Sequence, residues 1–270
     1  MSSARPLRLL HITDSHLFED ESEELYGVVT GASFRAVIGQ ALAEVGDHID
    51  AVLATGDIAE DGRRGTYERF RSQVLPFGAP VLCVPGNHED PAILAKVIDI
   101  PPLQYCGSLQ LPGWRVVMLD SHVPDKPGGW LVDSELARLE QELAASAGQH
   151  VLVCMHHQPI PIGSPWLDAV GLDNAAAFEA IVSRHDNVRA VLWGHVHQAS
   201  DRMHRGIRMM STPSTCAQFT PHTQRCIMDL EPPGYRWLEL AADGSINTHV
   251  VWLEAWRRTE RPPDSRQAAS

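Results

Sequence analysis

Five short segments of this chain carry aspartate, asparagine and histidine residues at spacings that suit a metal-binding or acid–base site. In order they are Asp14-x-His16, Gly56-Asp57, Gly86-Asn87-His88-Glu89, His156-His157 and Gly194-His195-x-His197. Each segment follows a run of aliphatic residues typical of a buried β-strand. A single histidine after a strand is most often solvated or hydrogen-bonded within the protein. Five such segments in order are strong evidence for one shared site.

Asp57 is the residue on which the other segments are expected to converge. It closes the apolar run that begins at Asp50 with a Gly-Asp turn, so its carboxylate should lie at the carboxyl end of a sheet. A carboxylate there can bind two cations at once. Nitrogen and oxygen donors without thiolate suit Mn, Fe, Zn or Co, and not a Cys-rich structural zinc site. We therefore expect two divalent metal ions.

The charge balance of such a centre favours a phosphodiester as substrate. Two divalent cations, two carboxylates and one bridging hydroxide leave about one positive charge, which attracts a singly negative diester. Asn87 makes sense as a neutral ligand, because a third carboxylate would cancel that charge.

Alternating strands and helices position these segments in the first part of the chain. We expect strands at residues 7–13, 51–55 and 80–84, and helices at about 34–45, capped by Ser33 and ended by Gly46, and at 66–74. In each case the polar residues lie at the carboxyl end of the strand, where open α/β sheets bind ligands.

The second half of the chain continues the alternation of helices and strands and then changes to short strands alone. We expect helices at 91–98 and at 134–145, the latter with Asp133 as N-cap, and one ending near Arg184. Strands are expected at 114–119, 150–155 and 188–193. From Arg208 onward the pattern is one of short alternating strands, including 235–240 and 248–253, which should complete the second sheet of a sandwich.

Composition limits the domain count and the partners. With 270 residues, 44% of them hydrophobic, the chain can form one catalytic domain, which we place at 1–254. Residues 255–270 are rich in Arg, Pro and Ser and are expected to be a disordered tail. A formal net charge of -12 argues against a nucleic-acid polymer as partner, because binding to nucleic acid needs Lys and Arg.

The cysteines and the N-terminus indicate a cytoplasmic protein. Five cysteines without C-x-x-C spacing are expected to be reduced thiols. The first six residues lead directly into a strand without an apolar leader, and no apolar run of about 18 residues occurs. We therefore expect no export and no membrane partner.

The order of the five segments resembles the calcineurin-like metallophosphoesterase family, and more closely its class III cyclic-nucleotide phosphodiesterases. The resemblance covers nearly the whole chain. It extends beyond the metal motifs to four stretches, which are Leu10–Phe18, Gly163–Asp168, Thr212–Phe219 and Pro233–Trp237. It implies an α/β fold, a four-layer αββα sandwich of two mixed β-sheets flanked by helices.

The resemblance also implies a role for each residue. Asp14, His16 and His197 would hold one metal ion. Asn87, His156 and His195 would hold the other, with Asp57 bridging the two. His88 would be an outer-sphere catalytic residue that touches the phosphate or protonates the departing oxygen. The substrate contacts would come from His16, Asn87, His88 and His197.

The implied reaction is the hydrolysis of 3′,5′-cyclic AMP to 5′-AMP. The two metals, Fe or Mn with Zn or Co as alternatives, would lower the pKa of a bridging water, whose hydroxide attacks phosphorus in line. A homodimer is compatible with this family. One alternative is a broader phosphodiesterase acting on glycerophosphodiesters or 2′,3′-cyclic nucleotides. A scaffold that only binds proteins is disfavoured, because every expected ligand position is filled.

Several residues leave finer questions open. Phosphoprotein phosphatases of this fold carry an Arg where Asp61 stands here, which disfavours a phosphoprotein substrate, although Arg63 and Arg64 follow closely. Glu89 and Gln158 depart from the cyclic-nucleotide pattern, which often has Asp and His there. These departures concern substrate detail and not the metal centre.

Four further residues each allow two interpretations. His157 is expected to support His156 or to be structural, and His11 to be packed rather than to bind metal. Trp166 would stack on a purine or pack against its own loop. Asn174 would reach the base or serve the start of a helix.

Overall fold

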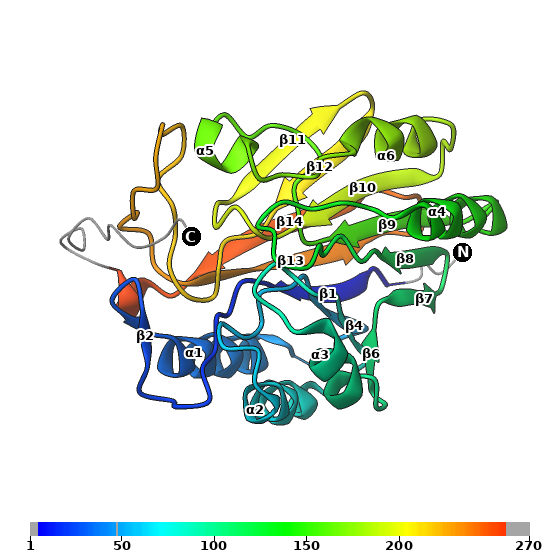
Figure 1. The fold of residues 1–270 in the computed structure, drawn as a ribbon. Coiled ribbons are helices and arrows are strands. Elements are labelled where there is room, and N and C mark those ends of the chain that lie inside the picture. The colour runs from blue at the N-terminus through cyan, green and yellow to red at the C-terminus, as the bar shows by residue number, and fades with distance from the viewer. Residues whose placement is uncertain (1–4, 47, 258–270) are drawn as a thin grey trace.

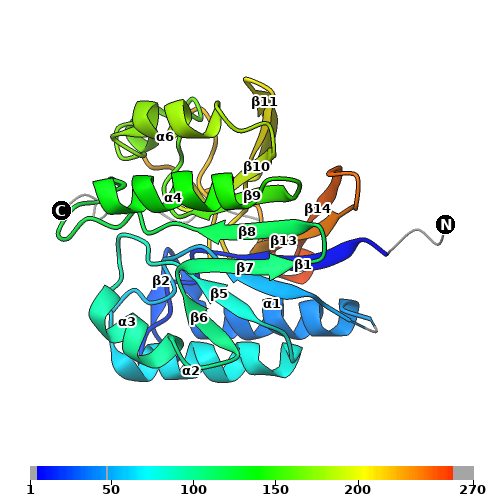
Figure 2. The same cartoon turned by 90° about the vertical axis from the view of Figure 1, so that its right-hand side faces the viewer.

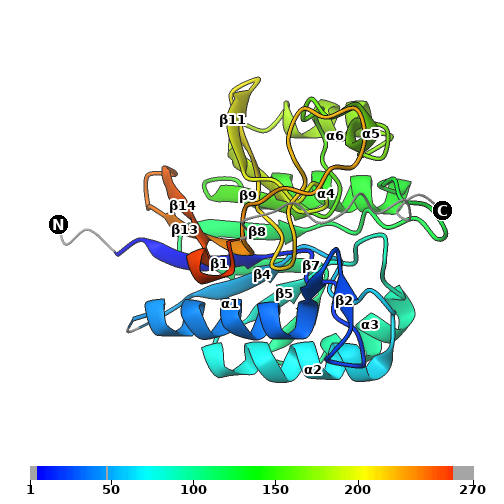
Figure 3. The same ribbon diagram turned by 90° about the vertical axis from the view of Figure 1, so that its left-hand side faces the viewer.

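Two six-stranded sheets lie face to face, and helices cover the outer face of each (Figure 1). This computed structural model describes residues 5–46 and 48–257. Helices α1 (Thr30–Glu44), α2 (Arg64–Val74) and α3 (Pro91–Ile98) cover one sheet, whereas α4 (Asp133–Ala145) and α6 (Ala175–Val182) cover the other, as Figures 2 and 3 show from the two sides. The four expected αββα layers are confirmed.

The first sheet combines a parallel half with an antiparallel half. Its order is β14-β13-β1-β4-β5-β6. The parallel strands β1, β4, β5 and β6 are followed outward from β1 by the antiparallel β13 and β14. The bounds are β1 (Leu7–Ile12), β4 (Ala51–Ala54), β5 (Val81–Cys83), β6 (Leu103–Tyr105), β13 (Gly234–Leu240) and β14 (Ile246–Trp252).

The second sheet has a parallel centre and one antiparallel strand at each edge. Its order is β11-β12-β10-β9-β8-β7. The bounds are β7 (Gly107–Leu111), β8 (Trp114–Met118), β9 (His150–Met155), β10 (Val188–Trp193), β11 (Ser200–His204) and β12 (Ile207–Ser211). The short elements are the hairpin β2 (Glu24–Leu25) and β3 (Val28–Val29), helix α5 (Pro165–Asp168), and the 3-10 helices η1 (Leu75–Phe77) and η2 (Glu254–Trp256).

The central strands are apolar on both faces because both faces are covered. In β1, Leu9 belongs to the cluster between the two sheets, whereas its neighbour Leu10 packs in the cluster beneath the helices with Phe34 of α1 and Phe70 of α2. All four side chains are fully buried. The rigid strands can therefore present the residues that follow them at fixed positions.

The predicted strands 150–155 and 188–193 and the predicted helix 91–98 coincide with β9, β10 and α3. The two predicted caps are wrong. Helix α1 begins at Thr30, directly after β3, so Ser33 lies inside it, and its buried hydroxyl donates to the Thr215 carbonyl. Asp133 is the first residue of α4 and not its N-cap, which is Val132. The negative charge of Asp133 in the first turn still interacts favourably with the helix dipole.

Of the strands expected to complete the second sheet from Arg208 onward, β12 lies in that sheet but β13 and β14 do not, which corrects the prediction. β13 pairs antiparallel with β1, and β14 pairs with β13, so both extend the first sheet. The physical reason is burial on both faces of β13. Tyr235 and Trp237 pack in the cluster beneath the helices, whereas Leu238 and Leu240 pack between the sheets. A position beside β1 provides both environments.

The predicted tail at 255–270 lies outside the described residues except for 255–257. There, Ala255 and Trp256 belong to η2, and Arg257 forms ion pairs with Glu231 and Glu254.

Among the helices that the structure describes, none is long and apolar enough to cross a bilayer.

Candidate metal centre

The structure brings the seven predicted metal ligands together where parallel strands of both sheets end. Asp14 and His16 follow β1, Asp57 follows β4, and Asn87 follows β5 in the first sheet. The second sheet supplies the other three from the ends of β9 and β10, namely His156, His195 and His197. The two sheets meet at this edge because they are stacked face to face.

The backbone at this edge is held in an unusual conformation. Five of the seven residues have a positive φ, between 46° and 65°: Asp14, His16, Asp57, His195 and His197. Residues other than glycine rarely adopt this region, and where they do, the surrounding structure must hold them there. The strand ends therefore force these side chains toward one point.

The first cluster contains Asp14, His16 and His197. His197 Nδ1 lies 2.7 Å from the Ala217 carbonyl and His16 Nδ1 lies 2.8 Å from Glu60 Oε2. Both partners accept hydrogen bonds, so Nδ1 of each ring is a donor and Nε2 is the ring atom left to bind a metal ion. These two Nε2 atoms are only 3.1 Å apart, and His197 Nε2 is 3.4 Å from Asp14 Oδ1. Nitrogen and oxygen atoms this close repel each other unless a proton or a metal ion lies among them.

The second cluster has the same signature. His156 Nδ1 lies 2.7 Å from the Thr55 carbonyl and donates to it, so Nε2 is the ring atom left to bind a metal ion. That Nε2 faces Asn87 Oδ1 at 3.2 Å and His195 Nδ1 at 3.1 Å. Ligand atoms bonded at about 2.0–2.2 Å to one metal ion lie about 3.0–3.5 Å apart. The side chains present therefore fit a metal ion in each cluster.

Asp57 lies between the two clusters. Its Oδ2 is 3.3 Å from His156 Nε2 in one cluster and 3.8 Å from His16 Nε2 in the other. Its Oδ1 accepts the backbone N–H of His88 at 3.0 Å. One oxygen is thus held by the protein, and the other faces both clusters.

The electrostatics keep these carboxylates ionised. Burial opposes the charge, but His156 and His88 lower the pKa of Asp57 well below its usual range. Burial likewise opposes the charge of Asp14, yet His197 lowers the pKa of that carboxyl to about 2. An ionised carboxylate is the form that binds metal.

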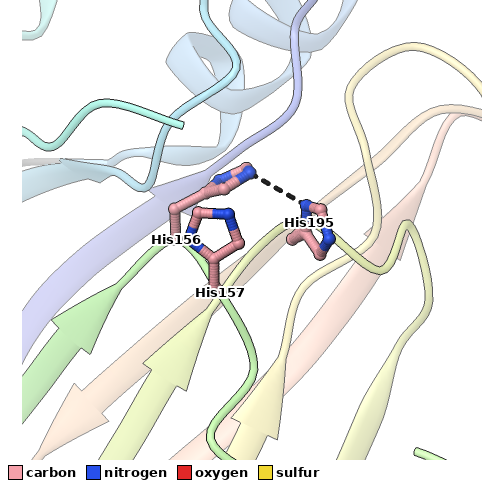
Figure 4. Close-up of side chains that lie close together, drawn as sticks. All are labelled: His156, His157 and His195. Atoms are coloured by element: carbon pink, nitrogen blue, oxygen red, sulfur yellow. Dashed lines mark hydrogen bonds between the residues drawn. The ribbon is translucent and has the colours of Figure 1, made fainter. Parts of the chain in front are cut away.

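His157 is buried beside His156 and His195, as Figure 4 shows, but both of its ring nitrogens have partners of their own. Nδ1 lies 2.8 Å from the Ser121 hydroxyl and Nε2 lies 3.2 Å from the Pro127 carbonyl. Its ring centroid is 4.8 Å from that of each neighbouring histidine. His157 therefore supports the two rings by packing, which agrees with the structural interpretation.

His88 stands at the rim of the site, with 37% of its side chain exposed. Its Nε2 is 4.0 Å from Asp57 Oδ2, and its Nδ1 is 3.1 Å from Glu60 Oε2. Burial lowers the pKa of His88, but the charges of Asp57 and Glu60 outweigh it and raise the pKa to about 10. His88 can therefore carry a proton toward a group bound at the clusters.

The supporting roles of three residues were missed from the sequence. Glu60 contacts His16 and His88, and Glu89 accepts hydrogen bonds from the backbone around Asp57. The Thr13 hydroxyl donates to Asp14 Oδ2 at 2.7 Å. No periodicity or spacing marks them, since acidic residues in a polar loop and a threonine at a strand end are common.

The open questions about Trp166 and Asn174 are partly resolved. The Trp166 indole packs against Phe219, with ring centroids 5.1 Å apart, and its Nε1–H donates to the Thr223 hydroxyl at 3.3 Å. Asn174 exchanges two hydrogen bonds with the backbone of Leu131. The Asn174 amide thus joins two loops, and its polar atoms are engaged there.

A cleft of about 690 Å³ opens beside His88. Arg63 and Arg64 line it, but the first pairs with Glu19 at 3.0 Å and the second with Glu68 at 3.0 Å. Acidic side chains also line this cleft: Glu19, Glu60, Asp61, Glu89 and Asp90. The two arginines are thus neutralised on the surface and form no clamp for a doubly charged phosphomonoester.

Comparison with known proteins identifies close relatives. Residues 7–199 match the model of the calcineurin-like phosphoesterase family. A 3′,5′-cyclic adenosine monophosphate phosphodiesterase CpdA from Vibrio vulnificus is 40% identical over 93% of this chain and 92% of its own length. The CpdA of Haemophilus influenzae is 39% identical over 92% and 90%, and that of Pseudomonas aeruginosa is 36% identical over 90% and 88%.

Solved structures of lower identity share the fold. A dimetal phosphatase from Danio rerio superposes with a TM-score of 0.65 at 16% identity, covering 92% of this chain and 99% of its own. A purple acid phosphatase from yellow lupin gives 0.65 at 13% identity, with 93% and 55% coverage. These likenesses support the α/β sandwich.

Proposed function

The chain belongs to the calcineurin-like phosphoesterase family, and from this premise we propose that it is a phosphodiesterase that hydrolyses 3′,5′-cyclic AMP to 5′-AMP. The relatives that are named for this activity match the chain over about nine-tenths of the chain's length. The reaction requires a nucleophile, stabilisation of charge on the phosphate, and a proton for the departing oxygen. The site has a candidate for each.

The observation that carries the proposal is the pair of clusters of closely spaced nitrogen and oxygen ligand atoms on either side of Asp57 Oδ2. Asp14, His16 and His197 would hold one divalent ion, and Asn87, His156 and His195 the other, with Asp57 shared. Two such ions supply Lewis-acid stabilisation of the phosphate and an activated water nucleophile. We propose Fe or Mn as the metals, with Zn or Co able to substitute, because the donors are nitrogen and oxygen.

The chain's own residues complete the reaction. His88 Nε2 points toward Asp57, so a phosphate bound over that carboxylate lies beside an imidazole that can donate a proton. His16, Asn87 and His197 would also border the phosphate. As the phosphorus–oxygen bond to O3′ breaks, the electron pair stays on O3′, which takes the proton from His88. The cleft next to His88 would accommodate part of the nucleoside.

A kinetic panel on metal-loaded enzyme tests the substrate. We expect kcat/KM for cyclic AMP to exceed that for cyclic GMP and for bis-p-nitrophenyl phosphate by about tenfold or more. Equal values for the three would contradict the cyclic AMP assignment and favour the broader phosphodiesterase. Metal analysis of the same preparation should give two ions per chain.

Location and assembly are also proposals. We propose a cytoplasmic enzyme, supported by Cys83 and Cys154, which are buried thiols. We also propose a homodimer, because β14 is the edge strand of its sheet within the described residues and an edge strand can pair with a second copy. Sedimentation equilibrium would test the dimer, and a concentration-independent monomer mass would contradict it.

A further inference from the structure

Six buried polar side chains form a continuous line of hydrogen bonds that ends at the metal centre. Each contacts the next through a side-chain atom, and all six are buried. From one end to the other they are Arg236, Thr212, His11, Thr55, Thr13 and Asp14. We refer to these six residues as the buried polar line. It connects a cationic side chain with a predicted metal ligand.

The line runs between the two sheets. His11 lies on the same face of β1 as Leu9, which packs between the sheets. His11 pairs across the strands with Arg236 of β13, whereas Thr212 follows β12 in the second sheet. At this depth each polar atom depends on its protein neighbours for hydrogen bonds.

The direction of the hydrogen bonds is set at the Arg236 end. A guanidinium group can only donate, and Arg236 Nε donates to the Thr212 hydroxyl at 3.2 Å. Within the described residues, the other partner of that hydroxyl is His11 Nδ1 at 2.5 Å. The Thr212 proton must therefore be donated to Nδ1, since a buried hydroxyl proton without an acceptor is costly.

His11 passes this direction on toward the metal centre. Burial, aided by the charge of Arg236, lowers the pKa of His11 to about 3, so the ring is neutral. A neutral ring that accepts at Nδ1 carries its proton on Nε2, which donates to the Thr55 hydroxyl at 2.7 Å. Thr55 then donates to the Thr13 hydroxyl at 2.9 Å, and Thr13 donates to Asp14 Oδ2 at 2.7 Å. Every donor in the line thus points toward Asp14.

The two oxygens of Asp14 therefore have different surroundings. Oδ2 accepts the Thr13 hydroxyl, and both oxygens lie 3.0 Å from the His195 N–H. Oδ1 lies 3.4 Å from His197 Nε2, in the first cluster. If the line ran in the opposite direction, Thr13 would donate to Thr55 and Oδ2 would lose that donor. The present direction holds Oδ2 and leaves Oδ1 to face the cluster.

We propose that His11 is a positioning residue for Asp14, which as the Nε2–H tautomer keeps the Thr13 hydroxyl donating to Oδ2 and leaves Oδ1 for the metal ion. This inference rests on the proposed function, because it assigns a role in holding one of the two ions. Hydrogen-bonding groups behind a metal ligand typically contribute about 10- to 100-fold to metal affinity.

The tautomer can be measured in the wild-type protein. NMR of the metal-free protein with ¹⁵N-labelled histidine distinguishes a protonated ring nitrogen from an unprotonated one. The His11 signals are those that disappear in His11→Gln. At neutral pH we expect Nε2 to carry the proton and Nδ1 to carry none. A proton on Nδ1, or on both nitrogens, would overturn the inference.

The effect on metal binding is tested by breaking the line in its middle. Thr55→Val keeps the shape of the side chain and removes the hydroxyl between His11 and Thr13. We expect the Kd of the first cluster for Mn²⁺ to rise by about tenfold or more, with no change at the second cluster. Titration followed by the EPR signal of free Mn²⁺ gives the Kd values. Anomalous diffraction at limiting Mn²⁺ shows which cluster has lost occupancy.

Two matched variants separate this effect from a general loss of packing. Thr55→Ser keeps the hydroxyl and should bind both ions like wild type. Thr30→Val makes the same change at a buried threonine of α1, whose hydroxyl has no hydrogen bond within the described residues, and should also bind both. His11→Leu should be no weaker in the double variant with Thr55→Val, because the two residues act through one line.

The possible failures are distinct. If wild type binds two Mn²⁺ ions and Thr55→Val binds them with unchanged affinity, or loses both equally, His11 does not act on Asp14 and the inference is wrong. Additive losses in the double variant would contradict it as well. If wild type binds Mn²⁺ at neither cluster, the proposed function fails, and this inference fails with it.

Discussion

Glu89 Oε2 accepts the backbone N–H of Asp57 at 2.8 Å. The buried carboxylate of Glu89 therefore fixes the loop that carries Asp57, the residue that lies between the two clusters. The same oxygen accepts the N–H of Gly86 at 2.5 Å, and Oε1 accepts the N–H of Ala59 at 2.9 Å. Glu89 therefore joins the loop after β4 to the loop after β5. The sequence suggested only that this position departs from a family pattern.

Replacing Glu89 by Gln should destabilise the fold and weaken metal binding. An amide has one acceptor oxygen, so at least one of the three buried N–H groups loses its partner and faces an NH₂ donor. An unsatisfied buried N–H costs about 1–3 kcal/mol of unfolding free energy. Urea unfolding of the metal-free protein would measure this. Glu23→Gln, at an exposed position just before β2, is the control and should leave the unfolding midpoint unchanged.

The convergence of the strand-end residues could be predicted because it depends on chain order alone. Apolar runs mark strands, and polar residues after parallel strands gather at one edge, which is where Asp57 and His195 lie. The position of β13 could not be predicted, because a strand that follows a long loop can reach either sheet. The roles of Glu60 and Glu89 depend on which backbone and rings face them, and loop composition does not reveal this.

Asp57→Asn and His88→Ala should separate metal binding from turnover. Asp57 Oδ2 faces both clusters, so an amide there should lower metal content and activity together. His88 belongs to neither predicted ligand set, and its loss should leave the metal content intact while kcat on cyclic AMP falls by about 10²- to 10⁴-fold. Elemental analysis and kcat on the same preparations would measure both. Full turnover in His88→Ala would contradict its assigned role.

Gly194→Ala should disrupt the first cluster. A methyl group on Gly194 would clash with the Thr13 hydroxyl and lie 2.6 Å from Asp14 Oδ2. Because the Asp14 carboxylate also accepts the His195 N–H at 3.0 Å, it cannot move without losing that contact. We expect kcat/KM to fall by about tenfold or more, in line with the cost of misplacing a group at a reacting centre.

Gly39→Ala is the matched control for this substitution. Gly39 lies inside α1, and a methyl group there meets nothing within 4 Å. Alanine is favoured over glycine in a helix by about 1 kcal/mol, so stability should rise slightly while activity stays unchanged. If both alanine variants lost activity to the same extent, the steric argument at Gly194 would be wrong.

Because of His11, the unfolding free energy of the protein should decrease as the pH falls. Its ring is fully buried, with Nδ1 2.5 Å from the Thr212 hydroxyl and Nε2 2.7 Å from that of Thr55. Burial, aided by the charge of Arg236, lowers the pKa of His11 to about 3. The folded protein therefore keeps His11 neutral at a pH where the unfolded chain, with a pKa near 6.5, has already taken up a proton.

The direction and steepness of the change in unfolding free energy with pH follow from this difference in bound protons. Above about pH 6.5 His11 is neutral in both states, so its contribution to stability is fully present there. Below that value the unfolded state binds one more proton than the folded state, and the unfolding free energy falls by about 1.4 kcal/mol per pH unit until the folded-state pKa is reached. Urea unfolding of wild type and of His11→Gln between pH 7 and pH 4.5 would isolate this contribution from other groups. The wild type should lose stability more steeply than His11→Gln, and equal slopes would mean that His11 is already protonated in the folded protein.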